Sequence, residues 1–322
     1  AAGADGSAAG GEVTILRVPG MWNGKGPAGI PDQGAGEYRL RILLPESSGL
    51  LAIRIPNIST ACELHVDGRK TFSRGTVGRD AAHTVPYQRP GTVFLAGANR
   101  DVELKLVVAN YHHRHGGIRT DLVIGKIEQI EERQNRKAAQ EFVVFGCLLM
   151  IGLYHLGLYA LRRKETANLF FAMLCLLVAL RMGLVGEVFL ARWLPFLNWT
   201  LSTRIEYTAF VLSGWAGVAY YSRMYPGELR KSWANALGGI AIVLVLATAL
   251  LPPLAFTSWL IAYQLYVLTI CAICILALVV ARYRKREAAN LALIGVAGMV
   301  AAVVNDILFY NGWSRSIDLA PF

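Results

Sequence analysis

The stretch EFVVFGCLLMIGLYHLGLYALRRK, residues 141–164, decides the fold class of this chain. As a helix, an apolar stretch of about 20 residues is long enough to cross a hydrocarbon core about 30 Å thick. Five further apolar blocks of similar length follow, and short charged turns separate them. The pattern predicts an all-α polytopic transmembrane bundle over 141–322, with six spans at 141–162, 167–190, 203–224, 234–252, 257–282 and 288–312.

The composition excludes several functional classes. Of the 322 residues, 54% are hydrophobic, which is unusual for a soluble protein. The formal net charge is +10, but much of the excess lies in short turns between spans, where it sets topology. We therefore expect no nucleic-acid partner. Cys271 and Cys274 form a CxxC within a predicted span, where small packing residues are a better interpretation than redox or metal chemistry.

The basic residues of the turns predict the orientation of the bundle. One set of turns holds ten Lys and Arg residues and the other set holds three. The richer set comprises Arg162, Arg163, Lys164, Arg223, Arg230, Lys231, Arg282, Arg284, Lys285 and Arg286, and the poorer set comprises Arg192, Arg204 and Arg315. Because basic turns stay in the cytoplasm, the residues before 141 are expected outside it.

The polar first part of the chain has a different pattern. Residues 1–12 are rich in Gly and Ala and are expected to be flexible. Short alternating runs separated by Gly and Pro turns follow over 13–125, and the Asp67-Gly68 turn marks a hairpin. They predict an all-β sandwich. Residues 126–140 contain neither Gly nor Pro and predict a polar helix that connects the sandwich to the first span, with a plain linker as the alternative.

Eight segments, taken in order and spacing, carry a family resemblance. In the bundle they are GLYHLGLYALRRK (152–164), NLFFAMLCLLVALRMGLVGE (168–187), TRIEYTAF (203–210) and NDILFYNG (305–312); before it they are VPGMW (18–22), YRLRILLP (38–45), ELHVDG (63–68) and ANYHHRHGGIRTDLVIGKI (109–127). With these segments the chain resembles the bacterial seven-transmembrane receptors with diverse intracellular signalling modules, 7TMR-DISM. The first part resembles that family's galactose-binding-like jelly-roll sensor domain.

The resemblance implies a sensor in the bacterial inner membrane. An extracytoplasmic jelly roll would bind a small molecule or glycan, and the bundle would pass the signal to a cytoplasmic output domain. In that family the output is a histidine kinase, as in two-component systems, a diguanylate cyclase, a nucleotide cyclase or a phosphatase. Residues 319–322 turn apolar where a seventh span would begin, so we expect a seventh span there, and the resemblance also implies a homodimer.

Ionisable residues inside predicted spans are costly and need a role. Counted along the helices at 1.5 Å per residue, several of them reach the outer half of the membrane. They are Arg181, Glu187, Arg204, Glu206, Asn305 and Asp306. We predict an Arg181–Glu206–Asp306 network, which serves either as a polar switch below the sensor domain or as a structural clamp between helices. His155, in the inner half of the first span, is interpreted as a packing residue, with a proton relay as the alternative.

Candidate ligand-binding residues gather in the predicted rim of the jelly roll. The HHRH segment is a poor metal site because no cysteine or nearby carboxylate completes a ligand set, so no metal or other cofactor is expected. Sugars bind through polar groups and an aromatic platform, although sandwich aromatics are more often core residues. The candidates are Trp22, Tyr87, Tyr111, His112, His113, Arg114 and His115.

No catalytic motif is present in the sequence: there is no GxSxG, P-loop or HExxH. The chain is therefore interpreted as a receptor. The alternatives are a transporter or an accessory binding protein for a small solute, and a membrane enzyme that uses His155 with Asp306. The enzyme is disfavoured because these two residues fall in opposite halves of the membrane.

Overall fold

The computed structural model describes residues 15–16, 18–22, 30–44, 49–95 and 100–310, without the side chains of 306, 309 and 310. The chain divides into two compact units, a β unit over 1–136 and a helical unit over 137–322.

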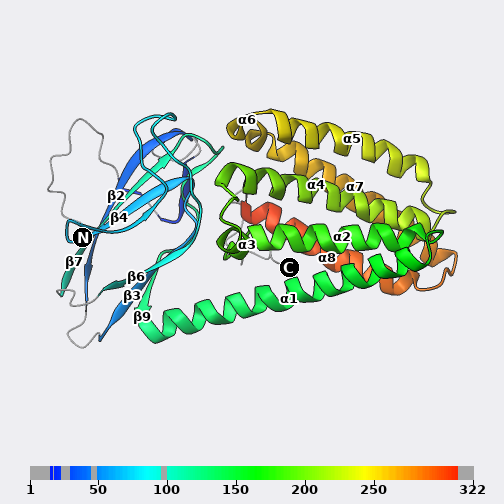
Figure 1. Ribbon diagram of the computed structural model, residues 1–322, viewed down its shortest axis with the longest axis horizontal. Coiled ribbons are helices and arrows are strands. Elements are labelled where there is room, and N and C mark those ends of the chain that lie inside the picture. Colours follow the sequence, from blue (N-terminus) through cyan, green and yellow to red (C-terminus); the bar gives the residue numbers. More distant parts are fainter. Residues whose placement is uncertain (1–14, 17, 23–29, 45–48, 96–99, 311–322) are drawn as a thin grey trace. The chain divides into compact units, whose positions relative to one another are not determined.

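The β unit is built from nine strands in its described part (Figure 1). They are β1 (Gly20–Trp22), β2 (Gly34–Leu43), β3 (Leu51–Ile55), β4 (Ala61–Val66), β5 (Arg69–Arg74), β6 (Gly91–Leu95), β7 (Asp101–Asn110), β8 (Gly116–Ile118) and β9 (Val123–Lys126). A four-stranded sheet has the order β2-β7-β4-β5, a three-stranded sheet has the order β6-β3-β9, and β1 pairs with β8. All pairings within these sheets are antiparallel.

The two larger sheets enclose one apolar core. Leu64 and Leu106, opposite each other on β4 and β7, are buried with Ile53 and Ile55 of β3. Alternation along each strand places these side chains on the inner face. The predicted hairpin is confirmed, because β4 and β5 meet at Asp67 and Gly68, both with positive φ. Such φ values fit a two-residue hairpin turn.

Helix α1 (Ile127–Leu161) follows β9 directly and begins on the β unit. Ile130 is buried and lies next to Gly125 of β9. Farther along, Gln134 accepts a hydrogen bond from Thr92 of β6 at 3.4 Å. The predicted polar segment 126–140 and the predicted first span are thus parts of one continuous helix.

The helical unit contains α1 from residue 137 and seven further helices in its described part (Figure 1). They are α2 (Thr166–Leu184), α3 (Phe189–Trp193), α4 (Trp199–Met224), α5 (Lys231–Leu250), α6 (Pro253–Ser258), α7 (Leu260–Tyr283) and α8 (Ala289–Tyr310). Helix α4 is central, since it contacts α2, α5, α6 and α7. Its Tyr207 packs edge-on against Phe256 and Tyr263 in the core of this unit.

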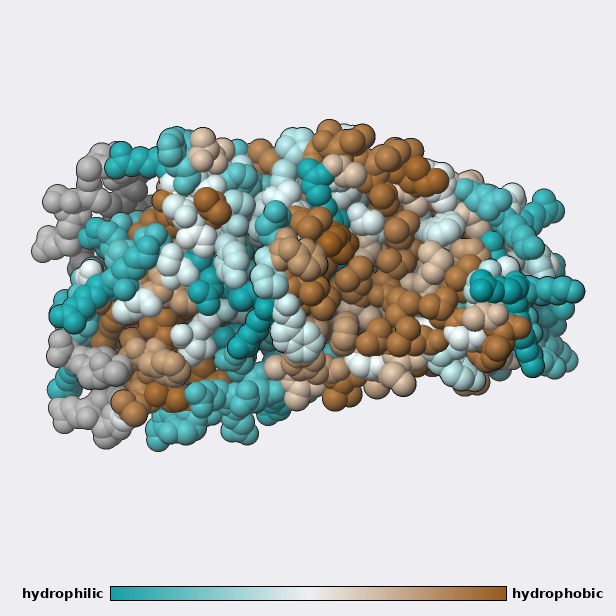
Figure 2. All heavy atoms as spheres, in the orientation of Figure 1, coloured by the Kyte–Doolittle hydropathy of each residue, from teal (hydrophilic) through white to brown (hydrophobic). Residues whose placement is uncertain are grey.

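Four helices, α1, α2, α5 and α7, are long and apolar enough to cross a membrane. Large apolar side chains such as Met150, Val243 and Leu276 are more than half exposed. Such a surface is stable only against an apolar solvent. Figure 2 shows hydrophobic surface along these helices and hydrophilic surface at the end that holds turns 162–165, 225–230 and 284–288. The helical unit is thus a multi-pass membrane bundle.

The predicted spans differ from the helices in three places. Helix α2 ends at Leu184 rather than at residue 190, because Gly186 and Val188 have positive φ and begin a separate helix, α3. Pro253 begins the short helix α6, so the fifth predicted span starts at Leu260. Helices α4 and α8 occupy the third and sixth predicted spans, and α4 begins at Trp199 rather than at residue 203.

Candidate functional site

The 110–116 loop of the β unit is organised around the buried side chain of Asn110. Its amide nitrogen donates to the backbone oxygens of Asp32 at 2.9 Å and His113 at 2.7 Å. Its amide oxygen accepts from the backbone N–H of His113 at 3.1 Å. Asn110 ends β7 and is fully buried, so these bonds fix the path of the loop. The sequence analysis missed Asn110, because a single Asn at the end of a strand carries no distinctive signal.

The histidines of this loop are held mostly neutral. Burial, with Arg119 nearby, lowers the pKa of His113 to about 3, and its Nδ1 contacts the backbone oxygen of His115 at 3.0 Å. Burial and Arg114 lower the pKa of His115, although Asp32 lies 3.7 Å from its Nδ1 and favours protonation. A loop with neutral imidazoles beside two arginines can donate and accept hydrogen bonds near neutral pH.

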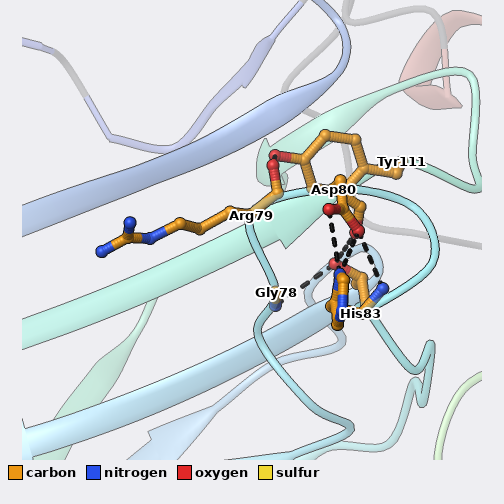
Figure 3. Close-up of polar contacts among 6 residues, drawn as sticks. Gly78, Arg79, Asp80, His83 and Tyr111 are labelled. Carbon is orange, nitrogen blue, oxygen red and sulfur yellow. Dashed lines mark hydrogen bonds and ion pairs between the residues drawn. The ribbon is translucent and has the colours of Figure 1, made fainter.

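A second loop, between β5 and β6, meets the first one. The hydroxyl of Tyr111 donates to the backbone oxygen of Arg79 at 2.5 Å, as Figure 3 shows. Next to it, the carboxylate of Asp80 contacts Nδ1 of His83 at 2.8 Å and accepts from the backbone N–H of His83. The hydroxyl of Thr84 closes this turn by donating to Asp80 O at 2.7 Å. These contacts bring Tyr111 and the 75–90 loop together.

The three candidate aromatic platforms lie in different environments. Trp22 is buried, stacks on Tyr38 and donates to the Tyr38 hydroxyl at 2.6 Å. It is therefore a core residue, and the prediction that it forms a ligand platform is corrected. Tyr87 is more than one-third exposed, with Arg89 above its ring at 5.4 Å, and Tyr111 is half-buried. Among the described residues, no three His, Cys, Asp or Glu side chains gather as metal ligands.

In the helical unit, α2 and α4 pack together and carry two residues of the predicted polar network, Arg181 and Glu206. The guanidinium of Arg181 lies over the ring of Phe210 at 5.2 Å. Glu206 precedes Phe210 by four residues and so shares its face of α4. The side chain of Asp306 lies outside the described residues, so the network stays a prediction. Arg204 instead donates to the backbone oxygens of Ala249 and Leu251, where it caps the end of α5.

Helix α1 carries several of its contacts with neighbouring helices along one stripe. Nδ1 of His155 lies 3.0 Å from the side-chain oxygen of Asn168 on α2, and its ring packs edge-on against Phe171. Toward the other end of the stripe, Glu141 is buried and accepts from the backbone N–H of Glu187 at 3.2 Å. The sequence analysis used Glu141 only as the start of a span; an acid at the head of an apolar run was the available signal.

At the basic end of the bundle, Glu228 joins two turns. Its carboxylate contacts Arg286 Nε at 2.9 Å and Arg284 Nη1 at 3.4 Å, from the turn between α7 and α8. The two arginine side chains are about half exposed, whereas the Glu228 side chain beneath them is not exposed to solvent. The ion pairs therefore lie close to the surface of the protein. The hydroxyl of Tyr225 also donates to the backbone oxygen of Glu287 at 3.1 Å. Three of the predicted basic turns lie at this end (Figure 1).

Replacing Glu228 by glutamine is expected to lower stability near neutral pH by about 1 kcal/mol or less, because its arginine partners are half exposed. Burial opposes ionisation of Glu228, but Arg286 and Arg284 outweigh it and hold its pKa below the ordinary value. A carboxylate with a lower pKa in the folded state stabilises the fold above its unfolded pKa, and the effect is lost as pH falls through the folded pKa.

Thermal unfolding across pH checks this prediction. The difference between the parent protein and Glu228→Gln should be present at neutral pH and vanish in acid. Glu165→Gln is the control, because the pair of Glu165 with Arg162 at 3.3 Å is exposed and glutamine keeps an acceptor for Asn168, so the effect should be smaller than that of Glu228→Gln. A difference that persisted in strong acid would contradict the assignment to this ion pair.

Comparisons with known proteins bear on each unit. Three solved structures share features with the β unit: a putative beta-galactosidase from Bacteroides fragilis and a GH2 beta-galacturonidase from Eisenbergiella tayi bound to galacturonate or to glycerol. Identities are 18%, 19% and 19%, and TM-scores are 0.27, 0.29 and 0.29. The matches cover 35%, 37% and 37% of this chain but only 18%, 22% and 21% of those proteins. Among curated proteins, none matches.

The helical unit has a family match. The family 7TMR-DISM_7TM, described as 7TM diverse intracellular signalling, matches residues 138–320. The match begins within α1 and extends beyond α8, so it includes every helix of the bundle. The chain therefore belongs to the 7TM diverse intracellular signalling family of membrane proteins.

Proposed function

We propose that this protein is a transmembrane receptor in which the β unit binds a carbohydrate outside the cytoplasm and α1 relays binding to the membrane bundle. The observation that carries the proposal is the continuity of α1, which begins on the β unit and continues as the first apolar helix of a signalling-family bundle. A helix that belongs to both units gives a continuous path along which a displacement can pass.

The rim formed by the 110–116 and 75–90 loops is the proposed ligand site. Tyr87 and Tyr111 supply aromatic faces, and His112, His113, Arg114 and His115 supply hydrogen-bonding groups on the same segment as Tyr111. Sugars present both C–H faces and hydroxyl groups, which match aromatic rings and polar side chains respectively. Because Asn110 and the Tyr111–Arg79 hydrogen bond hold the loops in place, the ligand meets a preformed site.

The relay requires that the ligand bind one bundle state more tightly than another. Ile130 and Gln134 anchor the start of α1 to the three-stranded sheet. The proposal also includes the Arg181–Glu206–Asp306 network, in which residues of α2, α4 and α8 would interact and favour one arrangement of these helices. Glu187 and Asn305 are assigned to the same polar layer.

The orientation follows from the charge of the turns. The basic end of the bundle faces the cytoplasm by the positive-inside rule, and the β unit lies on the opposite side of a bacterial inner membrane. A cytoplasmic output domain, reached through a seventh span, and a homodimer complete the proposed receptor. Its domains are the sandwich over 13–125, the helical connection over 126–140 and the bundle over 141–322.

The test measures glycan binding by the full chain in lipid nanodiscs. A panel of neutral and acidic oligosaccharides is titrated, and binding is followed by thermal shift and by calorimetry. At least one class should bind saturably, and Tyr111→Ala should weaken it roughly tenfold, the effect of losing one stacking contact. Phe94→Ala is the matched control, because Phe94 is an exposed aromatic on a sheet face rather than a loop.

Two results would count against this function. One is the absence of saturable binding for every oligosaccharide while the protein remains folded. The other is binding that Tyr87→Ala, Tyr111→Ala and Arg114→Ala all leave unchanged, which would move the ligand away from the rim.

A further inference from the structure

The first apolar helix has an unusual pattern of burial. Of residues 137–161 in α1, only Glu141 and Gly152 are buried, and Gly152 has no side chain. The most buried side chain of this span is therefore a carboxylate, whereas its large apolar side chains are half-buried or exposed. A buried ionisable group in a membrane segment is costly and is retained where it has a specific partner.

Glu141 meets the turn between α2 and α3. One carboxylate oxygen accepts from the backbone N–H of Glu187 at 3.2 Å. Gly186 has φ of 70°, and a Cβ atom there would lie 2.4 Å from Oε1 of Glu141. The turn thus has the one residue type that lets a carboxylate lie directly against its backbone. Lys137, one turn earlier on α1, adds a cation 4.0 Å away.

Other contacts of α1 include Phe142, whose ring packs against Phe189 and Trp193 of α3, and residues on the same stripe as Glu141. Phe145 packs edge-on against Phe189 of α3 at 5.1 Å between ring centroids. A Cβ at Gly152 would lie 2.8 Å from the side chain of Leu176 on α2, so the two helices approach closely there. Only 6% of the apolar window of α1 is buried, against 39% for α2 and 50% for α7. The core of the bundle therefore does not depend on α1, and its few contacts decide where α1 sits.

We propose that Glu141 is the coupling residue of the receptor, the point at which a movement of α1 reaches the α2–α3 turn and, through it, α2 and α4. The inference rests on the relay proposed above and adds the residue that performs it. A directional hydrogen bond to a backbone N–H suits this role, because it holds one register of α1 against the turn, whereas apolar packing tolerates sliding. The α2–α3 turn follows directly after the last turn of α2, which carries Arg181, so displacement of the turn moves the polar layer.

The test combines cross-linking with signalling output in the full-length receptor in its native membrane. Gly152→Cys and Leu176→Cys, in a background with the five native cysteines replaced by alanine, report the distance between α1 and α2. Glu141→Ala should reduce disulfide formation roughly tenfold, as expected for losing a charge-assisted hydrogen bond. It should also change basal output by a similar factor. Glu141→Gln keeps an acceptor for the N–H of Glu187 and should restore most of both signals.

A second substitution tests the contact from its other side. Gly186→Ala places a methyl group against the carboxylate and should imitate Glu141→Ala, while the double variant should be no worse than either single one. Met150→Ala is the control, because Met150 is an exposed apolar residue of the same helix that lies off the stripe, and it should leave output unchanged. If Glu141→Ala does not fold, the proposal is tested by Glu141→Gln, which should keep most of the cross-linking and output, and by Gly186→Ala, which should lower both.

The outcomes separate the coupling role from its alternatives. Reduced cross-linking with unchanged output would make Glu141 a purely structural contact and overturn the proposal, as would unchanged cross-linking. If no oligosaccharide alters output in the parent receptor while Glu141 variants shift basal output as expected, the proposed ligand fails and the coupling role stands.

Discussion

Replacing Asn110 by alanine is expected to destabilise the β unit by about 3 kcal/mol, because three hydrogen bonds are lost at a fully buried position. Two backbone oxygens, of Asp32 and His113, and one backbone N–H, of His113, would lose their partner. An unsatisfied buried polar group costs more than the net value of the bond it made. The 110–116 loop should then lose its defined path.

Thermal unfolding and hydrogen exchange of the full chain in detergent measure this effect. The transition of the β unit should fall by at least several degrees, and amides 111–116 should exchange faster, while the helical unit is unchanged. Asn110→Asp retains the acceptor for the His113 N–H and loses both donated bonds. Comparing it with Asn110→Ala separates the contribution of the accepted bond to stability from that of the donated bonds. Phe94→Ala, which changes an exposed residue on β6, is the surface control. An Asn110→Ala protein with parental stability would contradict the assigned role.

The same substitution tests the ligand site. If the 110–116 loop forms part of it, Asn110→Ala should abolish glycan binding although Asn110 itself is buried. Because binding to a disordered loop pays the entropy of ordering it, affinity falls even when every contacting side chain is present. Binding that survived Asn110→Ala would place the ligand elsewhere on the β unit.

Inserting two alanines between Asn135 and Arg136 is expected to abolish the response of the receptor while leaving both units folded. Each helical residue turns the chain by about 100°, so two residues rotate the parts of α1 by about 200° relative to each other. This site lies between Gln134, which contacts Thr92, and Glu141, which contacts Glu187, so both end contacts survive. The response should fall by roughly the 5- to 150-fold that typical coupling energies represent.

A seven-residue helical insertion at the same place is the matched control. Seven residues turn the helix by about 700°, close to two full turns, and restore the original facing of the stripe. Glycan binding should be unaffected by either insertion, and output should be lost only with two residues. Equal loss with both insertions would mean that length, not phase, carries the signal; no loss with either would exclude α1 as the relay.

Several features could be predicted from local pattern alone. The apolar blocks identified helices at every predicted span, because about 20 apolar residues in a row suit a membrane whatever lies beside them. Alternation and the Asp67-Gly68 turn identified the hairpin, because those signals act within a few residues. Family membership, carried by segments of the bundle, also followed from the sequence and is confirmed over 138–320.

Other features depend on contacts between distant residues. Trp22 is an aromatic residue of the kind that forms ligand platforms. In the structure, the pairing of β1 with β8 and stacking on Tyr38 bury it. Arg204 is a charged residue inside a predicted span, which suggested a place in the polar network. In the structure it donates hydrogen bonds to backbone oxygens at the end of α5. Chain order does not contain these distances, so residue type alone could not reveal these contacts.

The sequence by itself determined the membrane bundle, the β-rich first unit and the helical segment between them. Hydrophobic periodicity and the length of apolar runs are local properties, and they suffice to indicate a strand, an amphipathic helix or a membrane span. Only the tertiary structure decided which polar residues matter. Asn110 and Glu141 are an ordinary amide and an ordinary acid in the sequence. They become important because folding buries each beside backbone groups far away in the chain, where water cannot replace the partner.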